Sequence, residues 1–111
     1  MGGRDYLGEF EQVVLLALLR LGDPAYGAAI HREILSATGR DVSIPAVYVT
    51  LKRMEAKGLV SCRLGTSVEG GRATKNYRLE PAGAAALART RELLDNLWEG
   101  THLPASQESP S

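Results

Sequence analysis

The chain has 111 residues, enough for one domain with its own apolar core, and its formal net charge is zero at pH 7. A single cysteine excludes an internal disulfide framework, and no apolar run is long enough to span a membrane. Because the start of the chain has no secretory signal pattern, we expect a cytoplasmic protein.

The charges are distributed unevenly along the chain. Residues 40–78 carry eight basic and three acidic side chains, a net charge of +5, whereas the segments on both sides are net negative. A local basic region attracts phosphate groups even when the whole chain is neutral. The zero net charge therefore does not exclude nucleic acid as a partner.

Two helices are predicted in the first third of the chain. Residues 1–8 are glycine-rich and are expected to be flexible. Residues 9–21 form a helix with apolar side chains around most of its circumference, which predicts burial on more than one side. After a break at residues 22–24, a second helix is expected from about residue 25 to residue 38.

The stretch after these helices has the features of a DNA-reading helix. Ser43 can cap its N-terminus, Pro45 suits its first turn, and Gly58 suits a left-handed residue at its end. One face is an apolar stripe that comprises Ile44, Val47, Leu51 and Met54, with Tyr48 at its edge. The opposite face is cationic and partly apolar and comprises Pro45, Val49, Lys52 and Arg53. Such a helix fits a DNA major groove, although an ordinary amphipathic helix with a solvated charged face has the same pattern.

A β-hairpin is predicted directly after this helix. Strands at residues 59–65 and 74–79 flank a turn-forming stretch at residues 66–73, with Tyr77 and Leu79 facing inward. Arg72 near the tip suits entry into a DNA minor groove, which would make the hairpin a wing. The alternative is an inert hairpin in which Arg72 and Lys75 only solvate a loop.

A last helix is predicted at residues 81–99, followed by a disordered tail at residues 100–111. The fold class is therefore mainly α with a small antiparallel β-hairpin, a winged helix-turn-helix domain at residues 9–80 plus a C-terminal dimerisation helix. The first and last helices carry more apolar side chains than one small domain can cover, which predicts a homodimer. The expected interface residues are Phe10, Val13, Val14, Leu87, Leu94, Leu97 and Trp98.

The expected partner is double-stranded DNA, which these residues would contact in two ways. Phosphate contacts are expected from Lys52, Arg53, Lys75 and the backbone amides near Tyr26 and Gly27. Base contacts are expected from Ser43, Pro45, Ala46 and Val49, with Arg72 in the minor groove. Tyr48 either closes the edge of the core or places its hydroxyl on a phosphate.

The sequence indicates no catalytic, metal or cofactor chemistry. His31 and His102 lie far apart, and one cysteine gives no zinc-ligand spacing. No phosphate-binding loop is present, and His31 is expected to be a solvated surface residue. We therefore expect a protein that is not an enzyme and needs no cofactor.

Several motifs in this order resemble those of the PadR-like transcriptional regulators. They are Leu7-Gly8-Glu9-Phe10-Glu11, Tyr26-Gly27, Val47-Tyr48 with Thr50-Leu51, Arg53 through Gly58-Leu59-Val60, Gly70-Gly71-Arg72, Tyr77 and Leu79-Glu80-Pro81-Ala82-Gly83. The resemblance covers about residues 7–98 and implies a dimeric winged-helix repressor of a nearby operon, such as one of transporter genes. Only one helix follows the wing, as in a short branch of the family, so the first and last helices would form the dimer.

The resemblance also implies a small aromatic or lipophilic effector that relieves repression. Trp98, the only tryptophan, is the candidate residue for contact with an aromatic effector, and a purely structural anchor is the alternative. The alternative function for the whole chain is a winged-helix module that binds protein and does not touch DNA.

Overall fold

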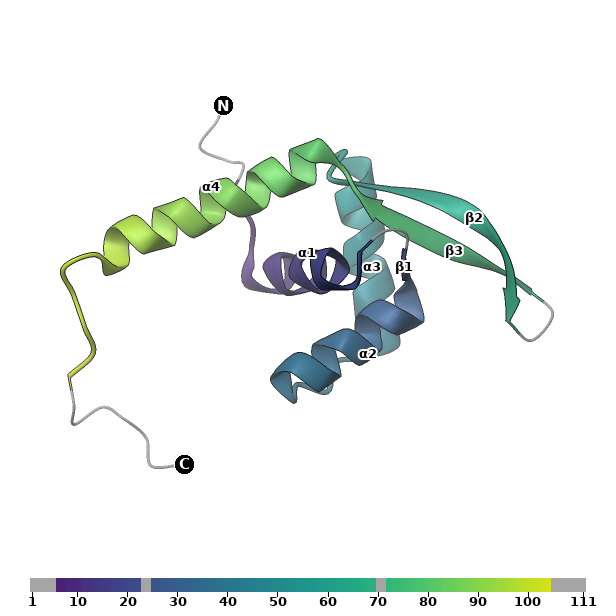
Figure 1. Cartoon of the computed structure of the whole chain (residues 1–111), viewed down its shortest axis with the longest axis horizontal. Coiled ribbons are helices and arrows are strands. Elements are labelled where there is room, and N and C mark those ends of the chain that lie inside the picture. Colours follow the sequence, from purple (N-terminus) through teal and green to yellow (C-terminus); the bar gives the residue numbers. More distant parts are fainter. Residues whose placement is uncertain (1–5, 23–24, 70–71, 105–111) are drawn as a thin grey trace.

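The computed structural model describes residues 6–22, 25–69 and 72–104 (Figure 1). The helices and strands within these residues are α1 (Glu9–Leu21), β1 (Ala25–Tyr26), α2 (Gly27–Thr38), α3 (Ile44–Ala56), β2 (Val60–Glu69), β3 (Arg72–Leu79) and α4 (Pro81–Trp98). Helices α1 to α3 form the body, from which the β2–β3 hairpin projects on one side and the far half of α4 on the other (Figure 1). The predicted fold class, a mainly helical winged helix-turn-helix, is confirmed.

The core is built from the apolar stripes of the three body helices. Its helical members are Val14, Leu15 and Leu18 of α1, Ile30 and Ile34 of α2, and Val47, Leu51 and Met54 of α3. Other members are Leu7 of the N-terminal segment, Ala17 of α1, Ala25, Val60 and Tyr77 of the sheet, and Ala86 of α4. The prediction for Ile44 was wrong: as the first residue of α3, at the end of the buried stripe, it remains 44% exposed.

Both ends of α3 are fixed as the sequence predicted. The Ser43 hydroxyl accepts a hydrogen bond from the Ala46 amide at 3.1 Å, which satisfies one of the free donors of the first turn. Gly58 has φ of 78°, a left-handed conformation that glycine adopts without steric penalty. These two residues determine where α3 begins and where the chain turns into β2.

The sheet contains a short strand that the sequence did not reveal. Ala25 and Tyr26 pair antiparallel with Tyr77 and Asn76, which gives the strand order β1–β3–β2. Helix α2 therefore begins at Gly27 and not near residue 25. A two-residue strand is too short to show any periodicity in sequence. Its pairing attaches the start of α2 directly to the hairpin.

The hairpin strands extend further than predicted. β2 continues to Glu69 and β3 begins at Arg72, with an irregular register between Leu64 and Val68. Most of the predicted turn-forming stretch is therefore strand. The predicted turn at residues 70–71 lies outside the described residues.

The N-terminal segment is anchored from Leu7 onward, which corrects the expectation of flexibility up to residue 8. Leu7 is only 8% exposed, and its amide donates a buried hydrogen bond to the Thr90 hydroxyl of α4 at 3.0 Å. The Gly8 amide donates to the Glu11 carboxylate at 3.0 Å.

In the predicted tail, residues 101–104 are exposed and have no helix or strand. Residues 105–111, like residues 1–5, lie outside the described residues.

The Leu7–Thr90 hydrogen bond generates a stability prediction. Thr90→Val keeps the side-chain shape but leaves the buried Leu7 amide without its acceptor, so it should destabilise the fold by about 1–3 kcal/mol. Urea unfolding followed by circular dichroism measures this. Thr101→Val, the same change at an exposed position, should stay within about 0.5 kcal/mol of the unchanged protein. Equal effects of the two changes would contradict the anchoring role of Thr90.

Candidate nucleic-acid interface

The outward face of α3 combines apolar and cationic side chains. Pro45, Val49, Lys52 and Arg53 are all exposed, and Val49 is 59% exposed in the middle of the helix. This face lies opposite the buried stripe that holds α3 against α1 and α2. Ser43 and Ala46, at the start of α3, are already joined to each other by the capping hydrogen bond.

One carboxylate, Glu11 of α1, tempers the charge of this face. Its side chain is 12% exposed and lies 3.9 Å from Arg53 and 3.3 Å from Lys57. Burial raises the pKa of Glu11, but the Gly8 amide and the two cations outweigh it and hold that pKa below its ordinary value. Lys52, by contrast, has no ion pair among the described residues, so its charge is free to act on a ligand.

The N-terminus of α2 carries no acidic residue and no side-chain cap. Tyr26 is the N-cap residue, and its hydroxyl accepts from Arg32 at 3.3 Å while the Arg32 guanidinium lies 5.9 Å from the ring centre. The backbone N–H groups of a helix start carry partial positive charge. This end of α2 therefore favours an anion such as a phosphate.

Gly27 is also a packing position, and its predicted role in DNA binding, through the backbone amides at the start of α2, stays a prediction. It is buried, and a Cβ there would collide with the Tyr48 ring. The same ring lies 6.4 Å from that of Tyr77, tilted by 57°. Tyr48 thus closes the edge of the core between α2 and β3, and its hydroxyl lies against the start of α2.

The described part of the β2–β3 hairpin has one cationic and one apolar side chain exposed side by side, Lys75 and Leu64. Lys75 is exposed and pairs across the strands with Leu64, which is 68% exposed. Leu64 was not predicted from the sequence, although it lies two residues beyond Cys62, whose cross-strand partner Tyr77 is buried. An apolar residue that continues an inward-facing pattern past the end of the core was the available signal. Arg72 opens β3, and the placement of its side chain lies outside the described part.

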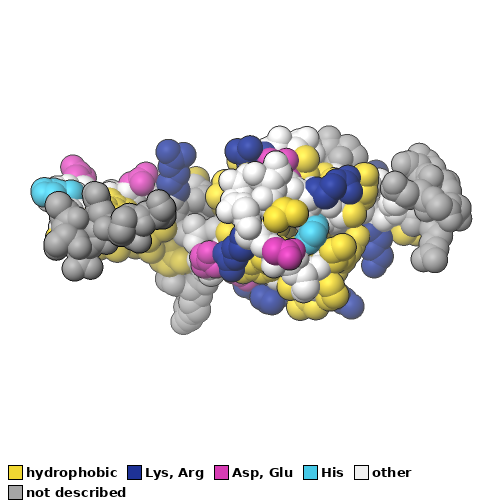
Figure 2. All heavy atoms as spheres, turned by 90° about the horizontal axis from the view of Figure 1, so that it is seen from below, with side chains coloured by type: hydrophobic (Ala, Val, Ile, Leu, Met, Phe, Trp, Pro, Cys, Tyr) yellow, Lys and Arg dark blue, Asp and Glu magenta, His cyan; other side chains and the backbone are white. Residues whose placement is uncertain are grey.

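The charges on the end of the body are mixed. Figure 2 views the molecule from below, where α2 and the loop before α3 lie, and shows Lys and Arg side chains among apolar and uncharged ones, with single acidic groups between them. This view therefore shows no unbroken basic surface. Any attraction for phosphates on this side depends on individual cations.

A separate apolar groove lies between α1 and α4. It has a volume of about 630 Å³, and its apolar lining includes Leu16, Leu19, Leu87, Leu94 and Trp98. Three of the predicted interface residues of α4 are thus brought together here with two exposed leucines of the apolar helix α1. Leu97, on the free half of α4, is exposed but does not line the groove.

Three other predicted interface residues do not belong to this surface. Val14 is fully buried inside the single chain, so it cannot contribute to an interface between chains. Phe10 and Val13 pack against the core, and the Arg40 guanidinium lies 5.6 Å from the Phe10 ring. The prediction for Val14 was wrong because α1 is apolar around most of its surface, and sequence alone does not show which faces the same chain covers. Phe10 and Val13 are only partly buried, so their place in an interface stays a prediction.

The remaining polar residues have structural roles. His31 is half-buried, with Nε2 2.6 Å from the Val42 carbonyl oxygen, so the expectation of a solvated histidine was wrong. Burial raises the pKa of the Tyr77 phenol, and the neighbouring Cys62 raises it further, so Tyr77 stays neutral.

Within the described residues, no group of three or more His, Cys, Asp or Glu side chains could hold a metal ion, and no helix is long and apolar enough to cross a membrane.

The fold and the site together define a winged helix-turn-helix protein with its outward helix and hairpin free for a ligand. The chain belongs to the transcriptional regulator PadR-like family, whose model matches residues 15–89. The family is one of transcriptional regulators.

Individual relatives agree with this assignment. The transcriptional regulator Rv3488 of Mycobacterium tuberculosis is 43% identical over 72 residues, which are 65% of this chain and 64% of that protein. The chain thus spans less than two thirds of the length of this curated relative. A PadR family regulator from Eggerthella lenta has a TM-score of 0.65 at 27% identity, covering 80% of this chain and 77% of that one. A PadR-like transcription factor from "bacteroid fragilis" has the same fold, with a TM-score of 0.70 at 24% identity, covering 88% and 89%.

The contact between Gly27 and Tyr48 generates a second prediction. Gly27→Ala forces a methyl group into the Tyr48 ring and should destabilise the fold by roughly 1–3 kcal/mol, because a packed core relaxes only in part. In a Tyr48→Ala background the same change should have little effect. Chemical unfolding of the four proteins of this double-mutant cycle measures the coupling. Additive effects would mean that the two residues do not restrain each other.

Proposed function

We propose that the chain is a sequence-specific DNA-binding repressor that acts in the cytoplasm as a homodimer on a nearby operon, such as one of transporter genes. The observation that carries the proposal is the outward face of α3, cationic and apolar together, held beside a basic hairpin. A solvated charged face needs no exposed valine at its centre, whereas a base edge or a thymine methyl group offers that side chain a partner.

In this function α3, the start of α2 and the wing each contact a different part of the DNA. Pro45, Ala46 and Val49 contact base edges in the major groove, together with the exposed Ser43, whereas Lys52 and Arg53 bind phosphates. Tyr26 and the amides at the start of α2 bind a further phosphate, to which the Tyr48 hydroxyl can donate. On the wing, Lys75 contacts the backbone, and Arg72 enters the minor groove.

The groove between α1 and α4 is the proposed dimer interface. Leu16, Leu19, Leu94 and Trp98 are exposed in the single chain and lie around one apolar hollow. A soluble protein rarely leaves such a surface uncovered. A two-fold dimer through this groove would cover both copies and place two α3 helices on half-sites about one helical turn of DNA apart.

A small aromatic effector is the proposed regulator of this dimer. Trp98 lines the same groove and presents an aromatic face there. A flat apolar compound between the protomers can change their relative orientation, and therefore the spacing of the two α3 helices. The groove has a size typical of small-molecule sites.

A gel-shift assay with DNA from upstream of its own operon, repeated at increasing salt, tests the DNA-binding proposal. Lys52→Ala should weaken binding to all sequences and lower the log–log salt slope by about one unit per half-site. Arg72→Ala should cost roughly 1–3 kcal/mol on the operator and much less on random DNA. Arg89→Ala, a charge removed from α4, is the control and should change neither.

Binding that ignores salt, or no binding at any salt, would reject the DNA-binding function and favour a protein-interaction module. An unchanged slope for Lys52→Ala would mean that this side chain faces solvent in the complex. Equal losses on both DNAs for Arg72→Ala would make it a plain phosphate contact.

The dimer interface is tested by the double change Leu94→Glu with Leu97→Glu. The change at Leu94 places one negative charge from each protomer in the desolvated groove, and the change at Leu97 adds one more from each beside it. The variant should therefore be a monomer that keeps its helical circular dichroism. Sedimentation should show the change in mass, and operator affinity should fall far more than random-DNA affinity. A double variant that stays dimeric would place the interface elsewhere, and an unchanged protein that is monomeric at micromolar concentration would reject the dimer.

The effector role is tested with flat aromatic compounds. They should quench Trp98 fluorescence and weaken operator binding over the same concentration range, because an effector must bind the two states with different affinity. Quenching with unchanged operator affinity would leave Trp98 as a structural anchor.

A further inference from the structure

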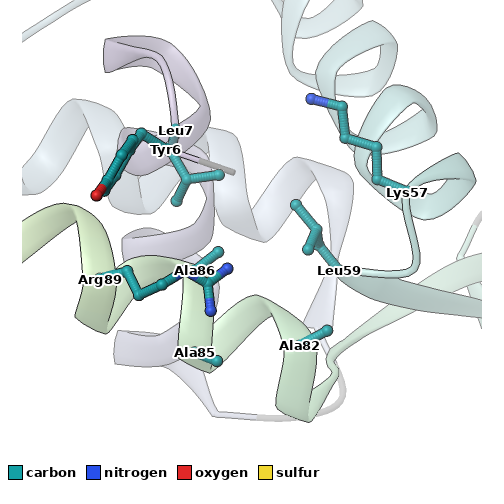
Figure 3. A pocket seen from close by; sticks show the side chains of 8 residues that line it. All are labelled: Tyr6, Leu7, Lys57, Leu59, Ala82, Ala85, Ala86 and Arg89. Atoms are coloured by element: carbon teal, nitrogen blue, oxygen red, sulfur yellow. The ribbon is translucent and has the colours of Figure 1, made fainter. Parts of the chain in front are cut away.

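A second cavity lies on the other face of α4. It has a volume of about 670 Å³ and is enclosed by α4, the N-terminal segment and the end of α3 (Figure 3). Ala82, Ala85, Ala86 and Arg89 of α4 line it, at positions that share one helix face. The lining residues of the α1–α4 groove on this helix, such as Ala84 and Leu87, are displaced by two positions and lie on the opposite face. The two cavities share no lining residue.

The wall of this cavity is aliphatic. Three alanine methyl groups of α4 form one side, and Leu59, in the short link between α3 and β2, faces them from the other (Figure 3). Leu7 closes the back and is held there by its hydrogen bond to Thr90. Because small and branched aliphatic groups make up this wall, and the one aromatic lining residue is Tyr6, it suits a hydrocarbon body better than a stacked ring.

The charge of the cavity is positive. Lys57 and Arg89 line it from different elements (Figure 3), and among the described residues no acidic side chain lines it. The Lys57 ammonium forms an ion pair with the Glu11 carboxylate, with Nζ 3.3 Å from Oε2. Arg89 has no ion pair within the described part of the chain. In Figure 3 the Arg89 side chain extends from α4 across the alanine methyl groups toward Leu59. An unpaired guanidinium above an aliphatic wall offers a bidentate partner for a carboxylate.

We propose that this cavity binds a small amphipathic carboxylate, with its aliphatic chain on the alanine wall and its carboxylate on Arg89, assisted by Lys57. This ligand and its site are distinct from the aromatic effector at Trp98. The cavity is lined by Lys57, the C-cap residue of α3, and by α4. If the DNA-binding function proposed above holds, the ligand connects the DNA-reading helix to the dimerisation helix.

The test is a titration of the full chain, carrying ¹³C-labelled alanine methyl groups, with sodium octanoate below its micelle concentration. The methyl signals of Ala82, Ala85 and Ala86 should shift together and saturate, while those of Ala84 and Ala88 should not. 1-Octanol has the same chain without the charge and should bind at least about tenfold more weakly than octanoate. Benzoate should also bind at least about tenfold more weakly. No DNA is present, so the result does not depend on the DNA-binding function.

Two matched pairs of variants on α4 locate the site. Arg89→Gln should weaken octanoate binding by about tenfold or more, because it removes a charge-assisted pair, whereas Arg91→Gln on the opposite face should not. Ala85→Leu should fill the cavity and block binding, whereas Ala84→Leu should not. Ala85 and Arg89 are exposed, and circular dichroism of each variant confirms that it folds.

Several results would overturn the proposal. These are no saturable shift with octanoate up to millimolar concentration, shifts centred on Ala84 and Ala88, and equal binding of octanoate and 1-octanol. An Arg89→Gln variant that folds and binds octanoate unchanged would also overturn it. Equal or tighter binding of benzoate would reject the aliphatic ligand class.

Discussion

The close approach of α2 and α3 at Gly27 is the contact on which the relative positions of α2, α3 and the hairpin depend. Because Gly27 has no side chain, the Tyr48 ring can lie directly over the start of α2 and still reach toward Tyr77 of the wing. One ring therefore restrains α3, the helix α2 before it and the hairpin. A helix can present side chains to a rigid DNA groove only if its own orientation is fixed, and this contact fixes it from two sides.

Ion pairs hold the C-terminal end of α3 to α1. Glu11 of α1 lies between Arg53 and Lys57, near the end of α3. Its lowered pKa means that it stays ionised at neutral pH, so part of the positive charge of α3 is compensated inside the protein. Lys52 has no such partner among the described residues. Two adjacent cations of one helix are therefore unequal: Lys52 is free to neutralise a phosphate, whereas Arg53 must share its charge.

Helix α4 lies over the body only along its first half (Figure 1). Its buried residues, Gly83, Ala86 and Thr90, lie in that half, where Thr90 accepts the Leu7 amide. Small side chains allow α4 to pack closely there, and they leave an aliphatic cavity beside it. Further along, Leu94 and Trp98 are exposed, because no described element covers them, and this half of α4 is where we propose that the second protomer packs.

The sequence by itself determined the elements whose signals are local. The Ser43 cap, the left-handed Gly58, the buried stripe of α3 and the inward Tyr77 follow from hydrogen-bonding capacity, backbone freedom and periodicity, which short stretches encode. Tertiary structure alone decided which faces were covered. The all-round apolar surface of α1 gave no means to separate Val14, buried in its own chain, from Leu16, which lines the groove. The two-residue strand β1, the anchoring of Leu7 and the role of Gly27 likewise arise from contacts between residues distant in the chain, and no local pattern records such contacts.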